Sequence, residues 1–362
     1  MAAMLETIKN CRWQIMINYR QLVIDQLKFK ETKPVPYARL YFEEGIAKKM
    51  DQYLASDKWR SSLHNAIIGW SGICVGSNDQ NVFTDEYGIT WTTGKGAMHI
   101  ESPPLNQPSL RGYDFPDVNR LCPDELLSEI NRNVVANKNF FTNVGFGFGL
   151  FERTWTLRGF ENTLMDVAAE PRFYMDMLSC VAEHQLKILS RLLQTDVDSI
   201  YFSDDWGDQR GVIIGAERWR HLIKPHLAVM YGKVHKAGKF VMSHCCGNIS
   251  EIIRDCIDIG LDCLQSVQPE AMNPYDLKKR FGGQISFWGG LGSQTTIPFG
   301  TCYQIKAEIH KLCVEMGRGG GYILGTAKSI LNDTPVENAV AVMEAFNNEF
   351  ESGLENNSVS WG

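Results

Sequence analysis

The second half of the chain alternates short apolar runs with longer stretches in which apolar residues recur every three or four positions. An apolar run of this length is typical of a buried strand, and the wider spacing is typical of an amphipathic helix. Five strands are expected on this basis, at 199–205, 239–245, 261–267, 285–290 and 321–327. Helices are expected at 217–235, 249–259, 274–280, 301–316 and 335–350. Such alternation predicts parallel strands joined by right-handed crossover helices.

The first half of the chain is less regular. Apolar positions have helical spacing over 5–27, and a short apolar run follows at 37–42. The segment 82–94 predicts a β-hairpin, because β-branched and aromatic residues flank a turn sequence. A further helical pattern covers 161–193, and we expect Pro171 to interrupt it.

Two α/β architectures fit this pattern, a (β/α)8 TIM barrel and an open, doubly wound sheet. Each predicted strand is followed by polar or glycine residues, in the stretches SDDWGDQ, SHCCGN, SVQPE, WGGLGSQ and LGTAKS. In a barrel all five stretches meet at one rim, whereas in an open sheet only those at the switch point meet. The pattern favours a barrel with an N-terminal helical and hairpin extension. We expect one domain over 1–350, in which the extension occupies about 1–120, and a polar tail at 351–362.

Composition excludes several classes of protein. The 362 residues are 44% apolar and 22% charged, which is typical of a globular chain. Lys and Arg number 36 against 42 Asp and Glu, a net charge of −6, so we expect neither nucleic acid nor a membrane as a partner. The N-terminal residues mix charged and apolar side chains without a signal-peptide core. We therefore expect a cytoplasmic protein whose ten scattered cysteines are thiols.

The most specific chemistry lies in the stretch SHCCGN. Side chains alternate along a strand, so His244 and Cys246 share one face while Cys245 points to the other. An imidazole and a thiolate on one face supply two ligands of a tetrahedral zinc site, and catalysis needs a further open position. The alternative is that these side chains simply pack at the strand end. The third ligand remains open among Asp204, Asp205 and Cys263.

Two adjacent carboxylates, Asp204 and Asp205, end the preceding strand. They point in opposite directions, so one faces the rim as a metal ligand, a general base or a substrate acceptor. The alternative is an N-cap or a loop salt bridge. We expect five side chains to contact the substrate: Trp206, Gln209, Gln268, Trp288 and Tyr322. The aromatic members offer flat apolar walls, although core packing is an equal alternative for Trp288.

The glycine-rich run GFGFG at 145–149 departs from the pattern of a phosphate-binding loop. We do not expect the ERTWT that follows to open a helix. The glycines at 317–321 precede a predicted strand instead of following one. Neither stretch has the context that a phosphate site requires.

Residues 244–301 resemble the uroporphyrinogen decarboxylase superfamily, in which an H-x-C-G strand end precedes a glycine-aspartate strand and a Q-P turn. The likeness continues upstream in SDDWGDQ and WRHLIKPHL, and downstream in GGGYIL and DTPVEN. It covers residues 140–350 well and the first third loosely. The resemblance implies a (β/α)8 barrel with an N-terminal extension.

This superfamily contains enzymes of more than one activity. Its heme-pathway decarboxylases hold the porphyrinogen carboxylates with arginines of an N-terminal segment. The corresponding segment here, 34–45, has only Arg39 beside Glu43 and Glu44, which suits such a substrate poorly. The resemblance therefore favours the cobalamin-dependent methyltransferase branch. Its zinc-thiolate members also use a cysteine near the last strand, where this chain has Gly-Thr-Ala at 325–327.

The resemblance implies a methyltransferase that moves a methyl group between a small methylated donor and a partner corrinoid protein. The donor would be a methoxylated aromatic or a methylamine. Zinc at His244 and Cys246, or a proton from Asp204 or Asp205, would stabilise charge on the leaving heteroatom. Family likeness also implies a homodimer. Two alternatives remain open, namely cofactor-free decarboxylation of a tetrapyrrole, and a tetrapyrrole- or corrinoid-binding protein.

Overall fold

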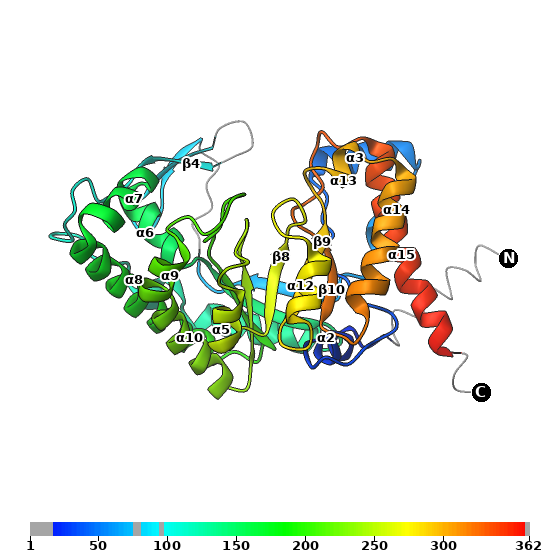
Figure 1. Ribbon diagram of the computed structural model, residues 1–362, viewed down its shortest axis with the longest axis horizontal. Coiled ribbons are helices and arrows are strands. Elements are labelled where there is room, and N and C mark those ends of the chain that lie inside the picture. Colours follow the sequence, from blue (N-terminus) through cyan, green and yellow to red (C-terminus); the bar gives the residue numbers. More distant parts are fainter. Residues whose placement is uncertain (1–16, 75–80, 94–97, 359–362) are drawn as a thin grey trace. The chain divides into compact units, whose positions relative to one another are not determined.

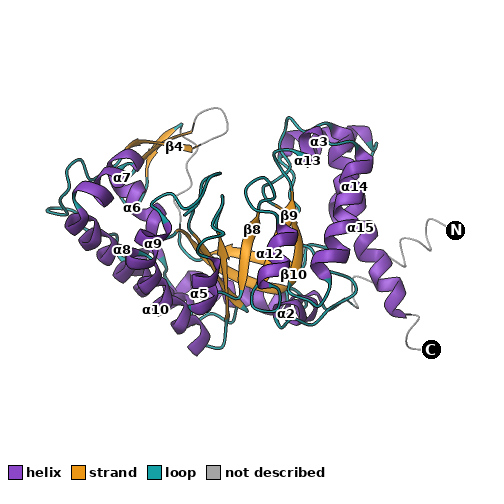
Figure 2. Cartoon of the chain, in the orientation of Figure 1, coloured by secondary structure: helices purple, strands orange, loops and turns teal. Residues whose placement is uncertain are grey.

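The structure is a computed structural model that describes residues 17–74, 81–93 and 98–358. Seven strands form one sheet in the order β1 (Ile67–Ser71), β5 (Phe141–Phe148), β6 (Ser199–Ser203), β7 (Phe240–His244), β8 (Cys263–Val267), β9 (Ser286–Leu291) and β10 (Tyr322–Thr326). The pairs β5–β6, β6–β7 and β7–β8 are parallel. Figure 2 shows these strands in orange and the helices in purple. All five strands expected in the second half are confirmed within a few residues.

The residues around Tyr37 take the place of an eighth strand. Tyr37 makes parallel bridges to Asn65, just before β1, and to Leu324 in β10. The Ala38 N–H donates to the Leu324 carbonyl at 3.0 Å, and the Ala66 N–H donates to the Tyr37 carbonyl at 2.7 Å. The hydrogen-bonded order therefore returns from its last strand to its first, as in a (β/α)8 barrel. The expected TIM-barrel fold class is confirmed.

The chain forms two compact units. Unit 1 comprises residues 1–68, 135–142 and 288–362, and unit 2 comprises 69–134 and 143–287. Unit 2 contains β6, β7 and β8, unit 1 contains β10, and β1, β5 and β9 each have residues in both.

Among the described residues, nine helices lie wholly or mainly in unit 2: α4 (Val118–Leu121), α5 (Asp124–Ala136), α6 (Leu150–Arg158), α7 (Phe160–Ala169), α8 (Pro171–Leu192), α9 (Ala216–Leu222), α10 (Lys224–Lys236), α11 (Ile253–Asp258) and α12 (Pro274–Phe281). The expected interruption at Pro171 is confirmed, because this residue begins α8. The helix expected at 217–235 is two helices, since Pro225 lies in the first turn of α10 and removes a helical N–H. Helices α8 and α10 pack beside each other (Figure 1).

The core of unit 2 lies between these helices and β5–β8. Ile200, Val241 and Leu264, on three successive strands, are fully buried. Phe202 of β6 meets the Tyr231 ring of α10 edge-on, with a centroid distance of 4.9 Å. This packing fixes the strands and with them the polar residues at their carboxyl ends.

The helical elements in the described part of unit 1 are α2 (Tyr19–Leu27), α3 (Glu44–Tyr53), η1 (Lys58–Ser62), α13 (Thr296–Phe299), α14 (Cys302–Lys311), η2 (Leu312–Met316) and α15 (Val336–Ser358). The first part of the helix expected at 5–27 lies outside the described residues. Helix α15 continues to Ser358, so most of the expected polar tail is helical. Helices α14 and α15, orange and red in Figure 1, pack side by side. No described helix in either unit is long and apolar enough to cross a lipid bilayer.

The expected hairpin is present as β2 (Val82–Thr84) and β3 (Thr90–Thr93), which pair antiparallel, and its Gly94 lies outside the described residues. The carboxylate of Asp85 holds the turn, because its Oδ1 accepts the N–H groups of Tyr87 and Ile89. A third strand, β4 (Met98–Ser102), adds to β3. Its sequence, MHIES, is too polar to have predicted a strand.

The expectation that no helix opens after GFGFG is wrong. Strand β5 ends at Phe148, and α6 begins at Leu150 after the N-cap Gly149. The local sequence has no capping side chain, which is why it gives no helix signal. The cap comes instead from Asp204, whose carboxylate accepts the first-turn N–H groups of α6 from beyond the next strand.

Candidate metal centre

The register of β6, β7 and β8 brings polar residues of unit 2 together. Ser203 pairs with His244, and His244 pairs with Gln265. Asp205 lies just beyond the end of β6, and Cys246 lies just beyond the end of β7. Carboxyl ends of parallel strands share one edge, so these side chains meet at that edge.

Asp205, His244 and Cys246 form a cluster whose ligand atoms all lie within 4.8 Å of one another. Cys246 Sγ lies 3.2 Å from His244 Nε2, and that nitrogen lies 3.6 Å from Asp205 Oδ1. Ligand atoms around a tetrahedral zinc are about 3.3–3.8 Å apart, given its usual bond lengths. The donor set therefore fits zinc. The expectation that His244 and Cys246 share a face is confirmed, and Asp205 is the third donor beside them.

The ring of His244 has a fixed orientation and tautomer. His244 Nδ1 lies 2.5 Å from Gln265 Oε1, and the same oxygen accepts the hydroxyl of Tyr201. A carbonyl oxygen only accepts hydrogen bonds, so Nδ1 is the donor, and in the neutral imidazole Nε2 then has the lone pair. That lone pair is the one available to a metal. Sequence analysis missed Gln265 and Tyr201, although a glutamine within the apolar run LDCLQSV was a usable signal.

Two glycines allow the loops after β6 and β7 to touch. A Cβ at Gly207 would lie 2.9 Å from the Cys246 carbonyl oxygen, and a Cβ at Gly247 would overlap the backbone of Gly207. Gly247 also has φ of 77°, which favours glycine. The close approach lets the Cys246 N–H donate to Asp205 Oδ1 at 2.7 Å. The two glycines thus determine the spacing of the donors.

The carboxylate of Asp204 is engaged away from this cluster. It accepts the N–H groups of Phe151 at 3.0 Å and Glu152 at 2.8 Å, and the Trp206 indole N–H at 2.6 Å. A Cβ at Gly149 would overlap the Asp204 side chain, so glycine is needed there. Asp204 therefore caps α6, as in the N-cap alternative, and its catalytic role remains a prediction.

Glu152 is a buried carboxyl that sequence analysis missed. Burial, followed by the negative charges of Asp204 and Asp205, raises the pKa of Glu152 to about 9. Burial also raises the pKa of Asp204, although the N–H groups that it accepts oppose this. Neighbouring buried carboxylates disfavour one another's ionisation, so Glu152 is protonated at neutral pH. Glu152 was missed because the stretch ERTWT was not predicted to lie at the start of a helix.

Two of the predicted substrate contacts are buried in unit 1. The Trp288 side chain is 1% exposed, and its indole N–H donates to the Ala38 carbonyl at 3.3 Å. Tyr322 is fully buried, and its hydroxyl donates to the Gly289 carbonyl at 2.8 Å. Both side chains thus have a packing role in unit 1, and contact with substrate remains a prediction for them.

The other predicted residues differ in exposure. Trp206 is buried, Gln209 is exposed in the loop after β6, and Gln268 is buried just beyond β8. Substrate contact remains a prediction for these three as well. Cys263, one of the alternative third ligands, begins β8 two residues before Gln265 and is absent from the donor cluster.

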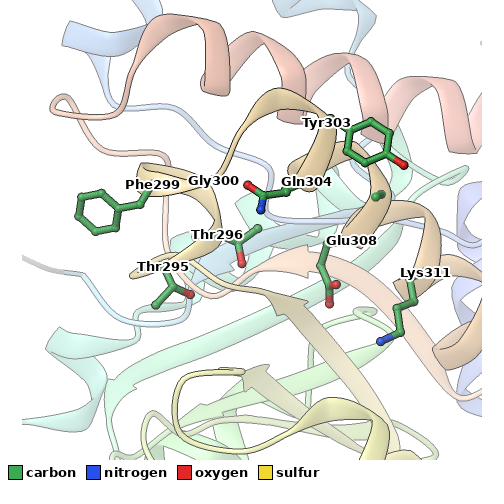
Figure 3. A pocket seen from close by; sticks show the side chains of 9 residues that line it. Thr295, Thr296, Phe299, Gly300, Tyr303, Gln304, Glu308 and Lys311 are labelled. Atoms are coloured by element: carbon green, nitrogen blue, oxygen red, sulfur yellow. The ribbon is translucent and has the colours of Figure 1, made fainter.

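A separate hollow of about 520 Å³ lies in unit 1 along α13 and α14 (Figure 3). Phe299 and Tyr303 stand at its sides and are 83% and 81% exposed. Glu308 and Lys311 lie further along the same face of α14. The hollow contains none of the predicted site residues.

The chain is similar to known proteins in family and in structure. The family model described as uroporphyrinogen decarboxylase (URO-D) matches residues 91–349. The chain is similar in structure to a methyltransferase from Methanosarcina mazei, with 16% identity, a TM-score of 0.69, and coverage of 93% of this chain and 100% of the other. A mannanase from Bacillus subtilis, man26, gives 13% identity, a TM-score of 0.41, and coverage of 90% and 88%. No curated protein matches by sequence.

Proposed function

The chain belongs to the uroporphyrinogen decarboxylase family, and from that premise we propose that it is a methyltransferase acting with a partner corrinoid protein. The methyl donor is a small molecule that carries the group on oxygen or nitrogen. The observation that supports this proposal is the convergence of Asp205, His244 and Cys246. A phenolate or an amine is a poor leaving group, so its methyl transfer needs positive charge or a proton at the heteroatom.

Asp205, His244 and Cys246 would hold a zinc ion and leave a further position for the donor heteroatom. Bound zinc would supply the positive charge, and the partner's reduced corrinoid would supply the nucleophile that takes the methyl group. Gln265 orients the His244 ring through Nδ1, and the Cys246 N–H restrains the Asp205 carboxylate. Such supporting contacts keep the ligands in place as charge moves.

Glu152 is suited to act as the acid. The bond between the methyl carbon and its heteroatom breaks, the electron pair stays on the heteroatom, and a proton from the Glu152 carboxyl neutralises it. This role requires a carboxyl that is protonated at neutral pH, and the raised pKa of Glu152 meets that requirement. The first turn of α6, fixed by the Asp204 carboxylate, positions the side chain.

The test is metal content together with methyl transfer. Freshly purified protein is expected to contain about one zinc per chain by plasma mass spectrometry, and His244→Ala and Cys246→Ala are expected to lose it. Methyl transfer from methoxylated aromatics or methylamines to reduced cobalamin, followed by visible absorbance, is expected to fall at least ~10²-fold in His244→Ala. Cys180→Ala, a cysteine of α8 outside the cluster, is the matched control and should change neither value.

Two outcomes would contradict the proposal. One is turnover by His244→Ala at the rate of the unmodified protein, which removes the imidazole from the reaction. The other is release of carbon dioxide from uroporphyrinogen by the protein alone, which would assign it to the cofactor-free decarboxylases.

A further inference from the structure

A buried arginine follows Glu152 in the first turn of α6. The Arg153 side chain is 4% exposed, and its guanidinium carbon lies 3.6 Å from the ring centroid of Tyr87 and 5.3 Å from that of Phe148. Its Nε and Nη1 atoms have no hydrogen-bond partner among the residues that the structure describes. Burial lowers the pKa of Arg153, because the charged form loses its hydration. A buried guanidinium with open hydrogen-bond donors favours the binding of a hydrogen-bond acceptor.

The acids near Arg153 do not neutralise it. Asp85, on the hairpin turn, has both carboxylate oxygens engaged, one by two backbone N–H groups of the turn and the other by the Trp91 indole at 2.8 Å. Within the described residues, Arg153 has no ion pair with a carboxylate of the chain.

Arg158, on the same helix, is also buried, but its donors have hydrogen-bond partners within the protein. Its Nε donates to Asp166 Oδ2 at 2.8 Å, and its Nη1 donates to the Leu105 carbonyl at 3.2 Å. Both arginines are more than nine-tenths buried, so depth alone does not explain the difference. The open donors of Arg153 are therefore a local feature of its position.

The surroundings of Arg153 are aromatic and belong to unit 2. Trp91 stacks on Phe148 at a centroid distance of 5.6 Å and an interplanar angle of 7°. Trp155 meets the same phenyl ring edge-on at 6.0 Å. Flat rings beside a guanidinium suit a small molecule with an apolar body and an anionic head, and the planar fork of arginine matches a carboxylate.

We propose that Arg153 binds the carboxylate of a small apolar acid, beneath the β2–β3 hairpin that carries Tyr87. That the acid is the methyl donor rests on the proposed function, whereas binding itself needs neither zinc nor a corrinoid. The two sites are connected along the chain, because Arg153 directly follows Glu152 in α6, and the negative charge of Asp205 contributes to the raised pKa of Glu152. The donor is then an acid such as a methoxylated benzoate, and its neutral analogues are poor ligands.

The experiment compares 4-methoxybenzoate with 4-methoxybenzamide, which has nearly the same shape but no charge. By titration calorimetry the unmodified protein is expected to bind the acid at least about tenfold more tightly than the amide. Arg153→Met is expected to abolish this preference without changing amide binding, and Arg153→Lys to retain part of it. Arg210→Met is the control, because Arg210 is a unit 2 arginine whose side chain is 93% exposed.

Thermal unfolding separates ligand binding from a structural role. Arg153→Met replaces a buried charge that has no ion pair within the described residues with an apolar chain among aromatic rings, so its melting temperature is expected to equal or exceed that of the unmodified protein. A lower melting temperature with unchanged preference for the acid would overturn the proposal. So would an unmodified protein that binds acid and amide equally. Binding of the acid without methyl transfer from it would overturn only the proposed function.

Discussion

The strands of unit 2 differ from those of unit 1 in what their polar side chains contact. In β7 and β8, and just beyond the end of β6, the side chains of His244, Gln265 and Asp205 contact other side chains or a loop N–H group. In β9 and β10, Trp288 and Tyr322 donate to backbone carbonyls instead. A side chain that satisfies a carbonyl supports the fold, whereas side chains gathered around one another leave lone pairs for a ligand.

The largest effect expected from this comparison is on the stability of unit 1. Trp288→Ala removes a fully buried indole and is expected to lower the free energy of unfolding by about 3–5 kcal/mol. Urea denaturation measures this change. Zinc content per folded chain should stay the same, because the donors lie in unit 2. Loss of zinc in a folded Trp288→Ala protein would contradict the comparison, because it would mean that Trp288 also supports the metal site.

A smaller effect separates the two adjacent aspartates. Asp204→Asn weakens the cap of α6 and is expected to reduce the free energy of unfolding by about 1–2 kcal/mol, with zinc retained. Asp205→Asn is expected to show the reverse, with zinc binding weakened and the free energy of unfolding of the metal-free protein nearly unchanged. Denaturation and metal analysis of both variants decide the matter. Equal behaviour of the pair would mean that capping and metal binding are not divided between these residues.

The last effect, which is the smallest when taken per pH unit, is a pH dependence of stability. The native state keeps a proton on Glu152 up to about pH 9, whereas the unfolded chain releases it near the ordinary glutamate pKa of about 4.3. Between these values the native state binds more protons, so its stability falls as pH rises, by about 1 kcal/mol per pH unit. Glu152→Gln is expected to lack this slope between pH 6 and 8. Urea denaturation at several pH values measures the free energy of unfolding of both proteins. Equal slopes of this free energy against pH would contradict the raised pKa of Glu152.

The fold and the principal pair of the site could be predicted from sequence. Apolar runs separated by helical spacing gave the strands, and the period of two along a strand placed His244 and Cys246 together. Alternation alone left open whether Asp204 or Asp205 faces the donors. Contacts distant in sequence settle the geometry, since Asp204 is drawn to the amides of Phe151 and Glu152.

The missed features depend on partners that lie far away in the chain. Helix α6 has its cap on another strand, so no local signal marks its start. Gln265 acquires its importance from the register that sets it opposite His244. Arg153 stands out through the hydrogen bonds that it lacks within the described residues, and a sequence gives no indication of those.

The bridges of Tyr37 have a consequence for how this protein is made. One partner, Leu324, is translated long after Tyr37 leaves the ribosome, when most of the polypeptide has already emerged. The early segment must therefore stay accessible until the end of synthesis, and contacts so distant in sequence slow the search for the native state. A nascent chain that stalls before its last strand leaves Tyr37 without its bridge to Leu324, and the unpaired strand edge makes such a chain prone to aggregate.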